Sequence, residues 1–120
     1  MKIIITESKL ENTVLKFLDS SNFVINDNGK TFNAYIYFLN NEGDNEAMIS
    51  VYYRNAFGEV RNFVYVNPKL INYATSFLPI SEEDFLNIVL YWVSNVLNME
   101  MSSIENADSA RQRHRIHVYR

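Results

Sequence analysis

Residues 31–39 read TFNAYIYFL, residues 46–54 read EAMISVYYR, and residues 60–66 read VRNFVYV. All three stretches are rich in β-branched and aromatic residues, which favour strands. A fourth stretch of this kind, at 22–26, precedes them. Each gap between neighbouring stretches contains asparagine and one of the three glycines of the chain, Gly29, Gly43 and Gly58. Both residue types tolerate the positive φ of tight hairpins, so the pattern predicts an antiparallel meander of three to four strands.

The sequence predicts one helix before this meander and two helices after it. Residues 7–20 carry apolar side chains at helical spacing after Ser8 and Glu11, which form a capping-box pattern. Asn67-Pro68 has the form of an N-cap followed by proline at the first helical position, and it predicts a helix over 68–77. Ser81 is the expected N-cap of a third helix that ends near residue 99.

The chain as a whole is therefore expected to be α+β. The meander would pack with one N-terminal helix and two C-terminal helices, and short terminal strands are expected at 2–6 and 115–120. Residues 100–110, which are rich in Ser, Asn and acids, are expected to form a loop. We expect a single α+β domain over 1–110, with 111–120 as a basic C-terminal tail or a final strand.

Charge is distributed unevenly along the chain. Residues 1–108 carry 7 basic and 14 acidic residues, a net charge of −7, whereas the segment 109–120 carries +4. The chain has no cysteine, which excludes disulfides and thiolate metal sites and favours a reducing compartment. The apolar start, Ile3–Ile5, is too short for a signal peptide or a membrane span. We expect a small acidic protein that is not secreted by a signal peptide and has no membrane partner.

Both faces of the predicted sheet are apolar or aromatic. One face collects Phe32, Ala34, Ile36, Phe38, Ala47, Ile49, Val51, Tyr53, Val60, Val64 and Val66, and it is the expected core face. The opposite face collects Tyr35, Tyr37, Met48, Tyr52, Phe63 and Tyr65, with Arg54 and Arg61 beside them. Helices could cover this second face in a three-layer packing. Alternatively it is an exposed surface that binds protein, for which tyrosine and arginine are favoured, or that stacks nucleobases.

The tail also supports two interpretations. Arg111, Arg113 and Arg115 are closely spaced and could contact nucleic-acid phosphates. Because the rest of the chain is acidic, we favour contact with protein, either the body of the chain itself, a second copy or another partner. The expected partner-binding residues are Tyr35, Tyr37, Tyr52, Arg61, Phe63, Tyr65, Arg111, Arg113 and Arg115.

Sequence patterns for catalysis, cofactors and metals are weak. The two histidines, His114 and His117, would face opposite sides of a strand, with no acid or cysteine nearby to complete a metal shell. The acids at 82–84 are explained by the dipole of the third helix. Residues 41–46 lack the spacing of a calcium loop, and the chain contains no glycine-rich phosphate loop. We therefore expect no enzyme activity, no cofactor and no metal.

The opening Lys2-Ile3-Ile4-Ile5-Thr6-Glu7-Ser8 leads into an amphipathic helix. The segment 1–18 resembles the start of many small uncharacterised proteins encoded by bacteriophages with AT-rich genomes. The resemblance implies a phage origin and no particular activity, and it places the protein in the host-cell cytoplasm or in a virion. With it, the expected function is a non-enzymatic protein–protein interaction module, either a self-assembling virion component or a modulator of a host protein. The alternative is a small nucleic-acid-binding protein that uses the basic tail and the tyrosine-rich sheet face.

Overall fold

A computed structural model describes residues 7–28, 33–56 and 59–108. Within these ranges the chain forms three helices and five strands, which confirms the predicted α+β class. Their order is α1 (Glu7–Ser20), β1 (Val24–Asn28), β2 (Asn33–Leu39), β3 (Ile49–Ala56), β4 (Glu59–Val66), α2 (Pro68–Phe77), α3 (Glu82–Leu97) and β5 (Ser103–Asn106). The terminal strands expected at 2–6 and 115–120 lie outside the described residues.

The five strands form one sheet in the order β1-β2-β3-β4-β5. Strands β1 to β4 are the expected antiparallel meander, and β1 covers 24–28 where the sequence predicted 22–26. The expectation of a loop over 100–110 is wrong for 103–106, because β5 pairs there with β4 in parallel. A parallel neighbour needs a long crossover, and the segment that contains α2 and α3 supplies it.

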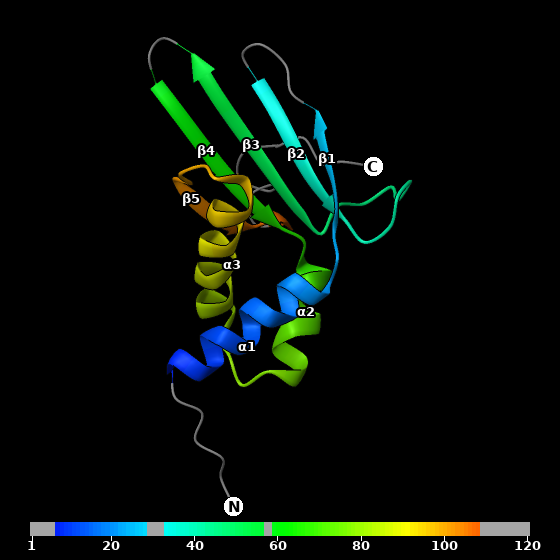
Figure 1. Ribbon diagram of the computed structural model, residues 1–120, viewed down its shortest axis with the longest axis vertical. Helices are drawn as coiled ribbons and strands as arrows, with labels where there is room; N and C mark the ends of the chain where they lie inside the picture. The colour runs from blue at the N-terminus through cyan, green and yellow to red at the C-terminus, as the bar shows by residue number, and fades with distance from the viewer. Residues whose placement is uncertain (1–6, 29–32, 57–58, 109–120) are drawn as a thin grey trace, which may run out of the picture.

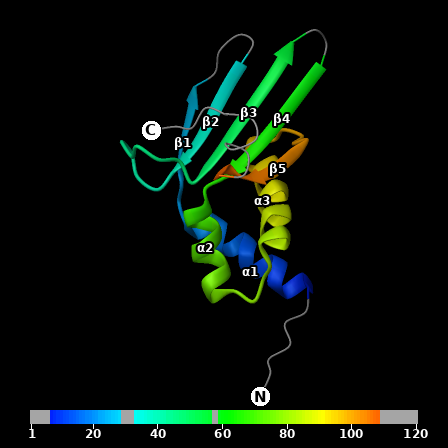
Figure 2. The same cartoon turned by 180° about the vertical axis from the view of Figure 1, so that it is seen from behind.

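The helices lie together on one face of the sheet and at one end of its strands, as Figures 1 and 2 show from two sides. The far ends of β1 to β4 therefore extend beyond the helices. No described helix packs on the opposite face, so within the described chain the sheet and helices form two layers. The described elements therefore do not form the three-layer packing, with helices on both faces of the sheet, that the sequence left open.

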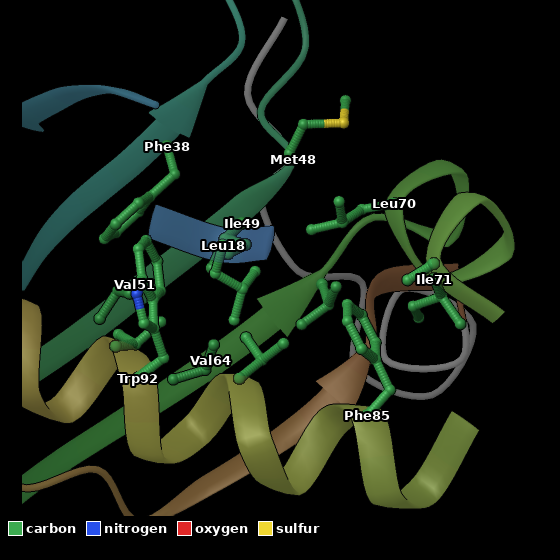
Figure 3. Close-up of a cluster of buried hydrophobic side chains, with 14 of the residues drawn as sticks. Leu18, Phe38, Met48, Ile49, Val51, Val64, Leu70, Ile71, Phe85 and Trp92 are labelled. Atoms are coloured by element: carbon green, nitrogen blue, oxygen red, sulfur yellow. The ribbon is translucent and has the colours of Figure 1, made fainter. Parts of the chain in front are cut away.

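The core lies between these two layers. Figure 3 shows side chains from the sheet, such as Phe38, Val51 and Val64, facing Leu18 of α1 and Trp92 of α3. Most of these side chains are fully buried. The indole Nε1 of Trp92 also donates a hydrogen bond of 2.8 Å to Oδ1 of Asp19, which links α3 to α1.

Alternation along the strands places most predicted core residues correctly, but two neighbours are reversed. Met48, expected on the outer face, packs in the main core, whereas Ala47, expected in the core, joins Tyr37 and Leu39 in a small cluster on the outer face. The reason is that β3 begins only at Ile49. Residues 47 and 48 precede the regular strand, so the period of two does not apply to them.

The caps predicted at Asn67 and Ser81 are present, whereas Ser8, predicted to open a capping box, lies inside α1, which already begins at Glu7. The Asn67 side chain accepts a hydrogen bond from the Lys69 N–H, with Pro68 at the first helical position, and Ser81 Oγ accepts one from the Asp84 N–H. Gly43 has φ of +85°, a conformation that its turn requires and that glycine adopts without strain. These local signals explain why α2, α3 and the β2–β3 connection begin where they do.

Candidate functional site

Five aromatic side chains gather on the face of the sheet that points away from the helices. We call this surface the tyrosine face, and it consists of Tyr35, Tyr37, Tyr52, Phe63 and Tyr65. The strand register brings three of them side by side, because Tyr35 of β2 is opposite Tyr52 of β3, which is opposite Phe63 of β4. All five residues were predicted for this face from the alternation of the strands.

Four of these five rings, those of Tyr35, Tyr37, Tyr52 and Phe63, form a chain of contacts. The Tyr35 and Tyr37 rings are stacked at 5.8 Å between centroids with an interplanar angle of 6°, and Tyr35 lies 5.1 Å from Tyr52. Tyr52 in turn stacks on Phe63 at 6.3 Å. Aromatic pairs at these separations contribute about 0.5–1.5 kcal/mol each beyond their area burial. The face is therefore a continuous aromatic row on a hydrogen-bonded sheet.

Burial varies along this row. Tyr37 is only 2 % exposed, whereas Tyr35, Tyr52, Phe63 and Tyr65 are partly buried. The tyrosine face thus combines a firmly held end, where Tyr37 packs with Leu39 and Ala47, with four rings that keep part of their surface accessible.

This environment raises the pKa of two tyrosines, Tyr35 and Tyr65. Burial raises the pKa of Tyr65, and the nearby Glu105 carboxyl raises it further, with smaller contributions from Tyr35 and Tyr52. Burial also raises the pKa of Tyr35, followed by the neighbouring Tyr52 phenol. Glu105 reaches this position because β5 pairs in parallel with β4, which puts it opposite Tyr65. Both shifts are upward from the ordinary tyrosine pKa near 10, so Tyr35 and Tyr65 lose their protons only in strongly alkaline solution.

The predicted basic residues are only partly placed. The backbone of Arg61 pairs with that of Arg54 near the β3–β4 hairpin, but neither side chain is among those described. Arg111, Arg113 and Arg115 lie outside the described residues. The structure therefore brings the five aromatic members of the predicted site together, and it leaves the four arginines as predictions.

A second surface, on the helix side of the molecule, was not predicted from the sequence. Phe17 of α1 forms a three-ring cluster with Tyr73 and Phe77 of α2, with centroid separations of 5.9, 5.6 and 5.1 Å. Beside it lies a pocket of about 610 Å³ that shares Phe17 and Tyr73 with the cluster. Tyr73 and Phe77 are four residues apart and so lie on one helix face, and this spacing could have indicated the aromatic cluster from the sequence. The pocket itself depends on a loop and two helices that meet only in the folded chain.

For the described residues, neither metal-ligating groups, nor membrane-spanning helices, nor similarity to known proteins indicates a function for these surfaces. Over 7–28, 33–56 and 59–108, no three side chains of the metal-ligating kinds gather into a group that could hold an ion. None of the helices in the same ranges has the length and apolar character needed to cross a bilayer. Comparison with protein-family models, with curated proteins and with solved structures found no significant match. The function is therefore inferred from the chain's own residues.

Proposed function

We propose that this chain is a non-enzymatic protein-interaction module that contacts its partner through the tyrosine face. One observation carries the proposal: a five-stranded sheet is packed by described helices on one face only, and the other face holds a row of four contacting aromatic rings with Tyr65 on the same face. Contiguous apolar surface of this kind commonly marks an interaction site.

The chemistry of the rings favours protein as the partner. Tyrosine and phenylalanine are enriched in the cores of protein–protein interfaces, where they supply much contact area for little loss of side-chain freedom. The phenol groups add hydrogen-bonding capacity, because a protonated phenol can both donate and accept a hydrogen bond. The sheet beneath them holds the row in one geometry, which lowers the entropic cost of binding.

The opening resemblance narrows the expected partner. In a phage-encoded protein, the tyrosine face would contact either a second copy of the chain in a virion assembly or a bacterial host protein. Absence of cysteine and confinement of both histidines to the segment 109–120 support the non-enzymatic part of the proposal.

A pull-down from bacterial extract tests the proposal with matched variants of the full chain. Tyr65→Thr shortens a tyrosine-face residue and keeps a strand-favouring side chain, whereas Tyr91→Ala shortens an exposed tyrosine of α3 on the helix side. We expect a specific protein, or a second copy of the chain, to be retained by wild type and by Tyr91→Ala and to be lost with Tyr65→Thr. Equal retention by all three proteins would contradict the assignment of the tyrosine face.

Nucleic acid is the second candidate, and the stacked Tyr35–Tyr37 and Tyr52–Phe63 pairs are the observation in its favour. Such rings can stack on nucleobases, and the arginines of 111–120 would supply phosphate contacts. The Glu105 carboxyl beside Tyr65 opposes it, because it would repel a phosphate backbone.

Fluorescence anisotropy with labelled single-stranded and duplex oligonucleotides separates the two candidates. The full chain is titrated beside a chain that lacks residues 111–120, at low and at physiological salt. The protein-interaction proposal predicts no binding even at low salt. Binding that requires the tail and weakens steeply as salt rises would instead establish the nucleic-acid candidate.

A further inference from the structure

Two aromatic side chains of α2 remain largely exposed to solvent although they belong to the ring cluster with Phe17 of α1. Tyr73 is 61 % exposed and Phe77 is 52 % exposed, although both rings touch Phe17. Large aromatic side chains that stay in water give up a substantial hydrophobic stabilisation. Two of them side by side, at one turn's spacing on one helix face, form a patch of the kind that recognises another molecule.

A pocket continues this patch into the molecule. Its volume is about 610 Å³, and its apolar lining comes from Phe17, Phe23, Met48, Leu70 and Tyr73. That volume falls within the range of about 300–1,000 Å³ for ligand pockets. We call the pocket and the adjoining Tyr73–Phe77 patch the α1–α2 groove.

The rim of the groove is held in place by polar contacts. Lys69 Nζ lies 2.7 Å from Glu46 Oε2, and Asn67 Nδ2 donates to Glu46 Oε1 at 2.8 Å and to the Ala47 carbonyl at 3.1 Å. These contacts tie the β2–β3 loop to the start of α2. A rim fixed before binding lowers the cost of ordering a ligand there.

Among the described residues that line the groove, two carboxylates, Asp44 and Glu46, stand against one cation, Lys69. The positive charge of Lys69 is matched by Glu46, which leaves the second carboxylate of the lining, Asp44. Asp44 Oδ2 accepts the Asn41 N–H at 2.9 Å, and in the described part of the chain no cation forms an ion pair with Asp44. A ligand with a positive charge at this position is therefore favoured.

We propose that the α1–α2 groove binds a short peptide segment of another protein. A large apolar or aromatic side chain of that segment fills the pocket, a neighbouring Lys or Arg pairs with Asp44, and the rest of the segment lies on Tyr73 and Phe77. The patch extends beyond the pocket along α2, which suits a polypeptide better than a small molecule that the pocket alone would hold. This site is on the helix side of the sheet and does not depend on the tyrosine face.

A display library of random short peptides tests this site on the full chain. Selection uses the wild-type protein, with counter-selection on the double variant Tyr73→Ser/Phe77→Ser, whose changes are at exposed positions. We expect enriched peptides to carry a large apolar residue close to a Lys or Arg. No enrichment over the double variant, or enrichment of acidic peptides, overturns the proposal.

A synthetic copy of the most enriched peptide then provides the quantitative test. We expect its affinity to fall about tenfold or more in Tyr73→Ser/Phe77→Ser, as for the loss of aromatic anchors. It should also fall several-fold in Asp44→Asn, which can still accept the Asn41 N–H, and it should weaken as salt rises. Unchanged binding in either variant overturns the proposed geometry.

Three controls separate the groove from the tyrosine face, from unspecific aromatic contact and from self-association. Tyr91→Ser removes a similarly exposed aromatic ring elsewhere and should leave peptide affinity unchanged. Tyr65→Thr should also leave it unchanged, so that failure of the tyrosine-face proposal and failure of this one are distinguishable. Sedimentation of the free protein tests the third case: self-association that Tyr73→Ser/Phe77→Ser abolishes would make a second copy, not a foreign peptide, the ligand of the groove.

Discussion

Asn67 is the residue on which most local contacts of α2 depend. It is buried, its side-chain oxygen caps the helix, and its side-chain amide binds Glu46 and the Ala47 carbonyl. Its backbone N–H also donates to the Met48 carbonyl at 2.8 Å. One side chain thus closes the helix start and anchors the β2–β3 loop.

Replacement of Asn67 by alanine is expected to lower the free energy of unfolding by about 2–3 kcal/mol, because the cap and two further hydrogen bonds are lost together. Urea unfolding followed by Trp92 fluorescence measures the change. Asn72→Ala, at an exposed position of the same helix, is the matched control and should change stability by less than about 0.5 kcal/mol. Equal effects of the two substitutions would contradict this role of Asn67.

The raised pKa of Tyr65 and of Tyr35 leads us to expect a lower free energy of unfolding at high pH. Their pKa is raised in the folded protein, mainly by burial, so an unfolded tyrosine loses its proton first, near pH 10. Above that pH the folded state binds more protons than the unfolded state, and the free energy of unfolding falls until the folded pKa is passed. Below about pH 10 the contribution is fully present.

Urea unfolding at a series of pH values measures this fall, and phenolate absorbance follows the titration itself. Tyr65→Phe should make the decline above about pH 10 less steep, because it removes one shifted group. Tyr91→Phe, at an exposed ring, serves as the control. A decline that is the same in both variants would mean that Tyr65 is not among the shifted tyrosines.

At the scale of elements, the Trp92–Asp19 hydrogen bond is the clearest link between α3 and α1. The indole N–H and the carboxylate oxygen are 2.8 Å apart, on residues 73 positions from each other in the chain. A hydrogen bond to a charged acceptor contributes about 1.5–3 kcal/mol. It therefore adds a directional contact to the apolar packing of the two helices.

A double-mutant cycle of Asp19→Ala and Trp92→Phe is expected to give a coupling energy of about 1–2 kcal/mol in urea unfolding. The matched cycle pairs Asp19→Ala with Tyr91→Phe, at the neighbouring exposed position, and should give a coupling close to zero. Additive effects in the first cycle would show that the hydrogen bond does not stabilise the helix pair.

The elements that the sequence predicts well are those specified by local chemistry. The bounds of α1 and α2 match the prediction because helical spacing and the Asn67-Pro68 start lie within the segments themselves. Strand β5 could not be predicted in this way. Its sequence, SIEN, is mostly polar, and what makes it a strand is pairing with β4, from which the whole of α2 and α3 separates it in the chain.

The two candidate sites also differ in how far the local sequence specifies them. The tyrosine face follows from the period of two along three adjacent strands, so its aromatic members could be predicted from the sequence. The α1–α2 groove needs α1, α2 and the β2–β3 loop in their folded positions, and Met48 in its lining was assigned to the wrong face because it precedes β3. Only the exposed pair Tyr73 and Phe77 could have indicated it.

At the scale of the whole molecule, the chain has two candidate interaction surfaces, one on each side of the sheet. The helices and the sheet share one core, which holds both surfaces on a single framework (Figures 1 and 2). The proposed function depends on the tyrosine face. The groove would add a second, separately testable contact.

Site-specific photo-crosslinking is the sharpest test of the tyrosine face as the binding surface. A benzophenone amino acid replaces Tyr65 in one preparation of the full chain and Tyr91 in another, and both are irradiated in bacterial extract. We expect one specific protein product, a second copy of the chain included, from position 65 and none from position 91. Crosslinking to nucleic acid from position 65, or the same products from both positions, would show that the tyrosine face is not a protein-binding surface.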